Sequence, residues 1–263
     1  MKCILFFLFS LTLLLSSTES RAQCIWPIKH PHYLFIGPEI YHLKRMRKGG
    51  SKQTGWLYGG KTIYERYKRC GFYWVLEGYY SLGRITGSTA SGKRLKSDLT
   101  DREIEGRLGY SFCIRKWRNL TLTPYGGYGY FYSKNDFHHP SPLPCEFHNR
   151  FNYGSAGLAA AICLTPSLEA TANIKAKFML KGKSRVKDDP DYNNVTLQMN
   201  NETQYEVEAP LRYYTCCRGW NIVASIAPFY RFRHYGGHAN YPFDFIDTKF
   251  HIYGGRVLFH LTF

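Results

Sequence analysis

The sequence predicts an all-β fold, a single up-and-down transmembrane β-barrel of about ten antiparallel strands. Three observations predict it. Apolar and polar residues alternate along many segments, aromatic residues and glycine are abundant although the mean hydropathy is negative, and long polar connections alternate with tight ones. Because the side chains of a strand point alternately to opposite faces, each alternating segment has one apolar and one polar face.

The composition favours a barrel in lipid. Aromatic residues make up 17% of the chain, with 22 Tyr and 18 Phe, and there are 24 Gly. A soluble core of this size would use more Leu, Ile and Val and fewer tyrosines. A barrel in lipid has aromatic girdles at both interfaces and a polar interior, which gives this mixture. A secreted β-sandwich shares much of the composition and remains the alternative fold.

About ten segments have the length of tilted membrane-spanning strands. In chain order they cover residues 33–43, 56–66, 72–80, 103–112, 120–130, 151–164, 168–178, 205–213, 222–233 and a last segment that ends at 263. Their apolar faces carry, in the same order, Leu34, Ile36 and Ile40; Trp56, Tyr58 and Tyr64; Phe72, Trp74, Leu76 and Tyr80; Ile104, Leu108, Tyr110 and Phe112; Leu120, Leu122, Tyr128 and Tyr130; Leu168, Ala170, Ala172, Ile174 and Phe178; Tyr205, Val207, Leu211 and Tyr213; Ile222, Ile226, Tyr230 and Phe232. The sixth segment is rich in Ala and Gly, and its facing is ambiguous.

The two ends of the chain indicate export and a membrane destination. Residues 4–15 are apolar and follow Met1-Lys2, and Ser20-Arg21-Ala22 places small residues where a signal peptidase cleaves, so we predict a signal peptide over 1–22. The last strand carries on its apolar side Val257, Phe259, Leu261 and Phe263. A terminal aromatic on such a strand, behind an export signal, resembles the closing strand of Gram-negative outer-membrane β-barrels.

This resemblance implies a location and a division of the chain. The protein would be integral to the outer membrane, with a periplasmic segment over 23–31 and the barrel over 32–263. The long connections, expected on the outside, are 45–55, 87–101, 133–150, 181–201 and 235–247. The tight turns, expected in the periplasm, are 67–70, 115–119, 165–167 and 216–219. An even number of strands then places both termini in the periplasm.

Charged residues on the polar faces are expected inside the barrel. They include Glu103, Glu105, Arg107, Lys175, Lys177, Glu206, Glu208, Arg212, Arg231, Arg233 and Arg256. In a barrel of about ten strands, such mixed charges form either a salt-bridged interior or the lining of a narrow pore. We predict the salt-bridged interior and keep the pore as the alternative.

The formal net charge of +16 indicates anionic partners. Three basic clusters fall in the expected outer loops: Lys44, Arg45, Arg47, Lys48 and Lys52; Lys93, Arg94 and Lys96; Lys181, Lys183, Arg185 and Lys187. Clustered cations attract polyanions over long range, so we expect contacts with lipopolysaccharide and the surrounding lipid, and with anionic polysaccharide. Simple solubility is the alternative explanation of the charge. No nucleic-acid-binding module accompanies the charge, so nucleic acid is not an expected partner.

The cysteines indicate disulfides at one end of the barrel. Of the eight cysteines, Cys3 lies in the expected signal peptide, and the other seven form an odd set. Those expected at the periplasmic end and available for pairing are Cys70, Cys113, Cys163, Cys216 and Cys217. In an oxidising periplasm they could pair within the chain or crosslink to other envelope proteins, and unpaired thiols are the alternative.

The predicted function follows from these features. We expect a structural or surface-interaction protein, with a narrow porin as the alternative and a hydrolase at the outer rim as a third hypothesis. Histidines and acids in the expected outer loops show no grouping of nucleophile, base and orienting residue. We therefore predict no catalytic site, no cofactor and no metal site.

Overall fold

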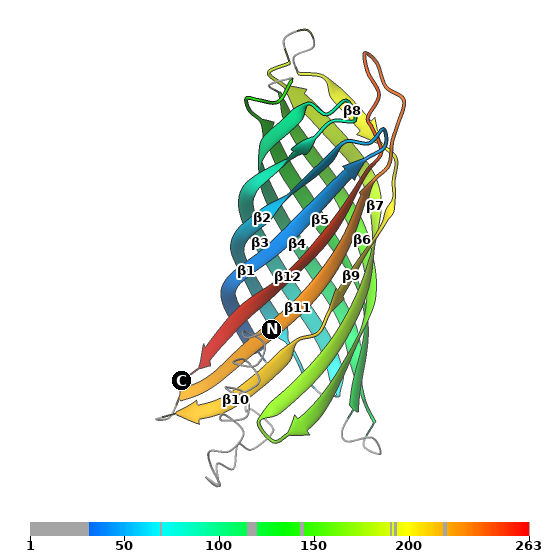
Figure 1. Ribbon diagram of the computed structural model, residues 1–263. Coiled ribbons are helices and arrows are strands. Elements are labelled where there is room, and N and C mark those ends of the chain that lie inside the picture. Colours follow the sequence, from blue (N-terminus) through cyan, green and yellow to red (C-terminus); the bar gives the residue numbers. More distant parts are fainter. Residues whose placement is uncertain are drawn as a thin grey trace.

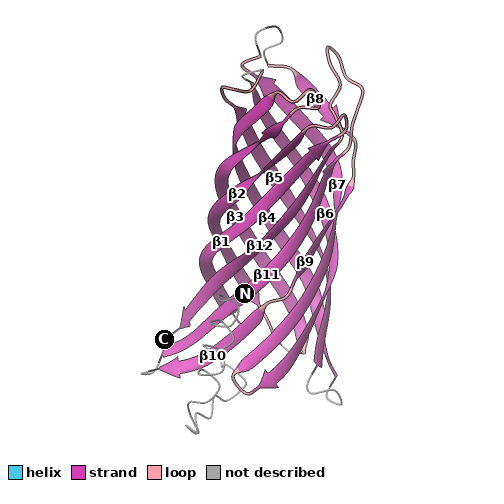
Figure 2. Ribbon diagram, in the orientation of Figure 1, coloured by secondary structure: helices cyan, strands magenta, loops and turns pink. Residues whose placement is uncertain are grey.

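The computed structural model describes residues 32–68, 70–114, 120–142, 145–189, 191, 194–217 and 220–262. All regular structure in these residues is β-strand, as Figure 2 shows. No helix in the described part of the chain is long and apolar enough to cross a membrane. The predicted signal peptide, the 23–31 segment and Phe263 lie outside the described residues.

Twelve strand segments close into one barrel (Figure 1). They are β1 (His32–Arg47), β2 (Lys52–Arg66), β3 (Gly71–Ser88), β4 (Arg94–Ile114), β5 (Leu120–Phe137), β6 (Glu146–Thr165), β7 (Leu168–Lys187), β8 (Thr196–Met199), β9 (Thr203–Glu208), β10 (Leu211–Cys217), β11 (Trp220–Tyr235) and β12 (Thr248–Thr262). Sequential neighbours pair antiparallel, and β12 pairs with β1 to close the ring. Because β8, β9 and β10 succeed one another between β7 and β11, the barrel has ten strand positions, as predicted.

The eighth strand position, formed by β9 and β10, is interrupted at a proline. Pro210 separates β9 from β10 and has no backbone N–H to donate to a ladder. Hydrogen bonds still cross the break, because the Ala209 N–H donates to the Pro228 carbonyl at 3.0 Å and the Thr171 N–H donates to the Pro210 carbonyl at 2.8 Å. The barrel wall therefore continues through the interruption.

The two ends of the barrel differ. The end that we name the loop end carries the connections 48–51, 89–93, 138–145, 188–195 and 236–247. At the opposite end, the turn end, β1 begins and β12 ends (Figure 1). The predicted alternation of long and short connections holds only in the second half of the chain, where 138–145, 188–195 and 236–247 at the loop end alternate with 166–167 and 218–219 at the turn end. In the first half, 48–51 and 89–93 are no longer than 67–70 and 115–119. Every predicted long loop extended too far into the neighbouring strands, the last one by a single residue.

The strands continue into those predicted loops because the pattern of facing inverts. Toward the loop end, apolar residues such as Leu43, Leu99 and Val186 point inward, while polar residues alternate with them on the outside. The strands predicted from outward apolar residues therefore end too early toward the loop end, although strand pairing continues there.

An apolar band surrounds the middle of the barrel. The predicted apolar faces point outward: Leu108 is 61% exposed and Ile174 is 60% exposed. On β4 the band runs from Ile104 to Phe112, which for a strand tilted about 40° spans roughly 23 Å, close to the band height of lipid-spanning barrels. The whole of β4 has 21 residues, or roughly 55 Å at that tilt, so about 30 Å of barrel extends past the band, mostly at the loop end.

A disulfide joins Cys70, just before β3, to Cys113 near the end of β4, both at the turn end. Their Cα atoms are 5.5 Å apart, within the usual range for a disulfide. We expect the unfolded, oxidised protein to run faster than the reduced protein on a denaturing gel, because the bond closes a loop over 43 residues of sequence separation. Cys70→Ser should abolish the difference, and Cys145→Ser, at the loop end, should preserve it. Identical mobility of the oxidised and reduced wild type would contradict the bond.

Candidate functional site

The centre of the lumen is built around Lys175 of β7. This side chain is 1% exposed. Its Nζ lies 2.7 Å from Glu105, 3.2 Å from Glu206 and 3.3 Å from Glu77. The three carboxylates come from β4, β9 and β3, so one ammonium group connects opposite walls of the barrel. The local sequence gives this arrangement because alternate residues of every strand point inward.

Arginines continue the network on the side of β11 and β12. Arg231 donates to both carboxylate oxygens of Glu39, at 2.8 and 3.0 Å, and to Glu206 at 2.9 Å. Arg256 pairs with Glu208 and, at 3.6 Å, with Glu39. Two-pronged arginine–carboxylate pairs fix geometry as well as charge. The network therefore holds strands far apart in sequence in one arrangement.

Most of the other inward charges are paired in the same way, whereas Arg45 donates to the Gln53 side chain instead. Further pairs are Arg107–Glu77 at 2.6 Å, Lys61–Glu77 at 3.2 Å, Lys177–Glu103 at 2.6 Å, Arg233–Asp101 at 2.8 Å and Arg212–Glu65 at 2.8 Å. The structure thus places all eleven residues of the predicted lumen network inside the barrel and brings them together.

The lumen is electrically balanced. Among the described residues, the buried acids are Glu39, Glu65, Glu77, Asp101, Glu105, Glu169, Glu206 and Glu208. The buried bases are Arg45, Lys61, Arg107, Lys175, Lys177, Arg231, Arg233 and Arg256. Glu103 and Arg212, which also face the lumen, add one charge of each sign, so nine charges of each sign cancel. The described residues carry 27 Lys and Arg and 18 Asp and Glu, a net charge of +9 out of the +16 of the whole chain, and this described excess lies outside the lumen, on the outer surface and at the ends.

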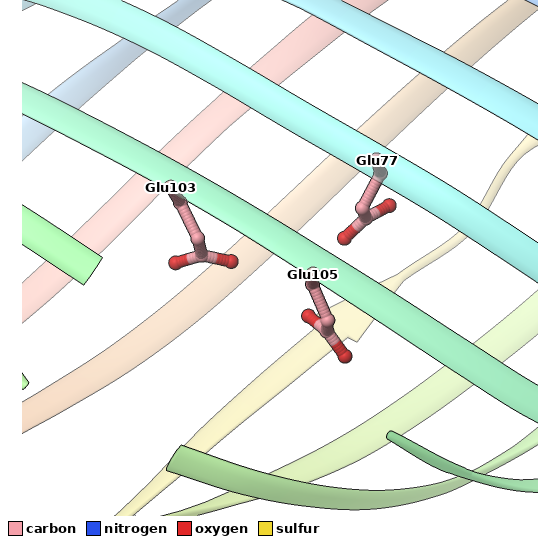
Figure 3. A group of neighbouring side chains, drawn as sticks. All are labelled: Glu77, Glu103 and Glu105. Atoms are coloured by element: carbon pink, nitrogen blue, oxygen red, sulfur yellow. The ribbon is translucent and has the colours of Figure 1, made fainter. Parts of the chain in front are cut away.

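Three carboxylates in this network lie close enough together to suggest a cation site. Glu77, Glu103 and Glu105 offer oxygens within 4.8 Å of one another, and Figure 3 shows them converging from β3 and β4. Each already has an ammonium or guanidinium partner, namely Arg107, Lys175 and Lys177 among others. Protein cations thus supply the positive charge that a metal ion would bring, and this cluster does not fit a metal site.

Buried apolar clusters lie on both sides of the charged layer. Toward the loop end, Tyr41, Leu57, Phe131 and Tyr235 belong to one buried cluster. Toward the turn end, Phe35, Tyr73 and Leu258 belong to another. A cavity of about 70 Å³ remains between the charges and the turn-end cluster, enough for a few water molecules. Side chains therefore fill much of the described lumen at these levels.

The predicted basic clusters lie mostly on strands, which corrects their assignment to loops. Lys44, Arg45 and Arg47 belong to β1, Lys52 to β2, Arg94 and Lys96 to β4, and Lys181, Lys183, Arg185 and Lys187 to β7. Only Lys48 and Lys93 lie in connections. Arg45 points into the barrel, where it donates to Gln53 at 3.1 Å and is 5% exposed, so it is not available to an external polyanion.

A row of outward side chains crosses four strands just beyond the apolar band. Lys183 of β7 lies opposite Arg150 of β6, which lies opposite Tyr132 of β5, which lies opposite Arg102 of β4. Sequence reasoning missed Arg102 and Arg150. Arg150 was assigned to a loop, and Arg102 fell just outside the predicted strand; extending the alternation past the apolar band would have found both.

Histidines at the loop end pair with carboxylates. His234 Nε2 lies 2.8 Å from Asp247 and its Nδ1 lies 3.5 Å from Glu202. His148 contacts Tyr132 at 2.7 Å and Glu146 at 2.8 Å. Burial alone would raise the pKa of Glu146, but hydrogen bonds from Lys134 and His148 outweigh it and lower the pKa to about 2. Both histidines lie on strands: His148 belongs to β6, within the stretch 133–150 that was predicted as a loop, and His234 belongs to β11.

Residues of the lumen network that the prediction omitted include Glu39 and Asp101. Asp101 was assigned to a loop because β4 was predicted to begin nine residues late, at 103 instead of 94. Glu39 could have been found, because it continues the inward set after Phe35 and Gly37.

No protein-family model matches the chain, and no curated protein matches its sequence. Solved structures do. The transport unit of the autotransporter AIDA-I from Escherichia coli superposes with a TM-score of 0.52 at 10% identity, over 96% of this chain and 94% of that one. The chain has the outer-membrane β-barrel fold. The outer membrane protease OmpT from Escherichia coli gives a TM-score of 0.53 at 10% identity, over 88% of this chain and 94% of that one. At such identity the likeness concerns the fold, and the functional subfamily stays open.

Proposed function

We propose that this protein is an integral outer-membrane β-barrel with a sealed lumen, which serves a structural or surface-interaction role. The observation that supports it most is the packed interior, in which charge-balanced ion pairs lie between two apolar clusters. Ion pairs with side chains under a tenth exposed, such as Arg231–Glu39 and Arg107–Glu77, leave little room for solute. In the orientation that we propose, the turn end of the barrel faces the periplasm and the loop end projects from the outer face of the membrane.

The outer surface supports the second half of the proposal. Because the buried charges of the lumen balance, the positive excess of the described residues faces the surroundings. Cations just beyond the apolar band are placed to contact lipopolysaccharide, and those farther out at the loop end are placed to contact anionic polysaccharide. Crosslinks to other envelope proteins through cysteine remain a prediction. Cys70 and Cys113 already bond to each other, and the side chains of Cys216 and Cys217 lie outside the described residues.

A conductance measurement tests the sealed lumen against a narrow porin. We expect the refolded protein to give no stepwise ionic current in planar bilayers, because ions would have to cross both apolar clusters. A porin reconstituted in parallel is the positive control, and a shift in gel mobility on heating verifies that the tested protein is folded. Reproducible current steps would contradict the sealed lumen and favour the porin.

A further inference from the structure

The row of outward side chains beyond the apolar band is a concentrated positive surface. Arg102, Arg150 and Lys183 are exposed, and Lys181, one row closer to the band, adds a fourth cation. None of the ion pairs among the described residues includes any of these four. Like charges directly opposite on antiparallel strands destabilise a sheet. Arg150 and Lys183 lie opposite each other and repel, and a bound anion from outside the described residues would relieve this repulsion.

Acidic residues on the same outer face lie farther from the membrane and are already paired. Asp98 and Glu146 are each four residues beyond the row along their strands, a distance of roughly 13 Å. Asp98 pairs with Arg84 at 2.8 Å, and Glu146 pairs with Lys134 at 2.6 Å. They do not neutralise the row.

The guanidinium of Arg102 is held in place by aromatic rings. It lies 5.1 Å from the ring centroid of Tyr80 and 5.9 Å from that of Tyr132. A guanidinium over aromatic faces keeps its N–H fork available for planar, two-pronged binding of phosphate. The Arg102 guanidinium is therefore pre-oriented to bind an anion, unlike a freely rotating charged side chain on the surface.

The depth of the row identifies the source of that anion. The outward residue that follows Arg102 toward the turn end is Ile104, which is 53% exposed and begins the apolar band. If the band meets hydrocarbon, Arg102 lies at its edge. Because the strands are tilted by about 40°, the row moves away from the band by roughly 3 Å per strand from β4 to β7, so its cations span roughly 9 Å of the headgroup layer. We propose that Arg102, Arg150 and Lys183 bind the phosphate groups of lipopolysaccharide in the outer leaflet. The proposal rests on the membrane location given under the proposed function.

Binding of purified lipopolysaccharide to the refolded full chain in a zwitterionic detergent tests the proposal. The test variant is Arg150→Gln/Lys183→Gln. The control variant, Lys48→Gln/Lys93→Gln, removes the same charge from exposed connections at the loop end. We expect the test variant to bind about tenfold or more weakly, as the loss of two charge-assisted contacts implies. The control should bind within about twofold of wild type, because its charges lie beyond the row.

Three outcomes would overturn the proposal. Equal weakening of both variants would indicate attraction by net charge alone, and unchanged binding of the test variant would remove the row from the contact. Equal binding of dephosphorylated lipopolysaccharide to the wild type would show that the acyl chains, not the phosphates, are recognised. Gel mobility verifies that each variant is folded. Fractionation of cell envelopes tests the membrane location separately, so failure of the phosphate contact alone can be distinguished from failure of the location.

Discussion

Replacing Lys175 with methionine will destabilise the barrel by about 3–5 kcal/mol, the cost of breaking a buried ion pair by removing one partner. Glu105 is affected most, because Lys175 supplies its one ion pair among the described residues. Its remaining partners are the hydroxyl groups of Tyr153 and Ser155, at 3.1 and 2.7 Å. Glu77 and Glu206 keep arginine partners. The change is measured as the free energy of unfolding in denaturant.

A second variant tests whether charge imbalance is the cause. Lys175→Met/Glu105→Gln removes both charges and keeps side chains of similar volume, so we expect it to recover at least half of the loss. Lys183→Met, on the outer face of the same strand, should cost less than about 0.5 kcal/mol. A Lys175→Met barrel within about 1 kcal/mol of wild type would contradict the view that the lumen network holds the walls together.

The network was predictable as a set of residues and not as a set of pairs. Alternation along single strands is enough to place Lys175 or Arg231 on the inner face. The partner of each depends on which strands lie across the lumen. Arg231 and Glu39 are 192 residues apart in sequence, and their contact requires closure of the ring. Nothing local in the sequence carries that information.

The outer surface was harder to predict for a different reason. Beyond the apolar band, the strand pattern no longer includes outward apolar residues, so polar stretches such as 133–150 suggest loops. In the structure β5 and β6 run through most of that stretch. Arg150 therefore lies on a strand of the barrel wall, directly opposite Lys183. Nothing in the sequence alone indicates that these two residues are neighbours. The position of Pro210, by contrast, was a local signal for the interrupted strand.

Leu108→Arg will destabilise the protein by about 2–4 kcal/mol when it is folded in lipid vesicles, the cost of an arginine on the lipid face at the bilayer midplane. Leu108 lies at the centre of the apolar band on β4 and is 61% exposed. An exposed leucine on a soluble protein would tolerate arginine, because the charge would enter water. The cost of this substitution therefore reports directly on the medium around the band.

Thr86→Arg on β3 is the matched control. Thr86 is exposed on the outer face at the loop end, beyond the apolar band, where its neighbours across β4 and β2 are Lys96 and Thr54. We expect a cost within about 0.5 kcal/mol there, since the guanidinium stays in water. Equal, small costs at both positions would place the band in water, and the proposed location, the headgroup contact and the outward orientation of the loop end would all fail together. Because the band height and the phosphate row depend on the same boundary, this pair of substitutions tests the assumption that both share.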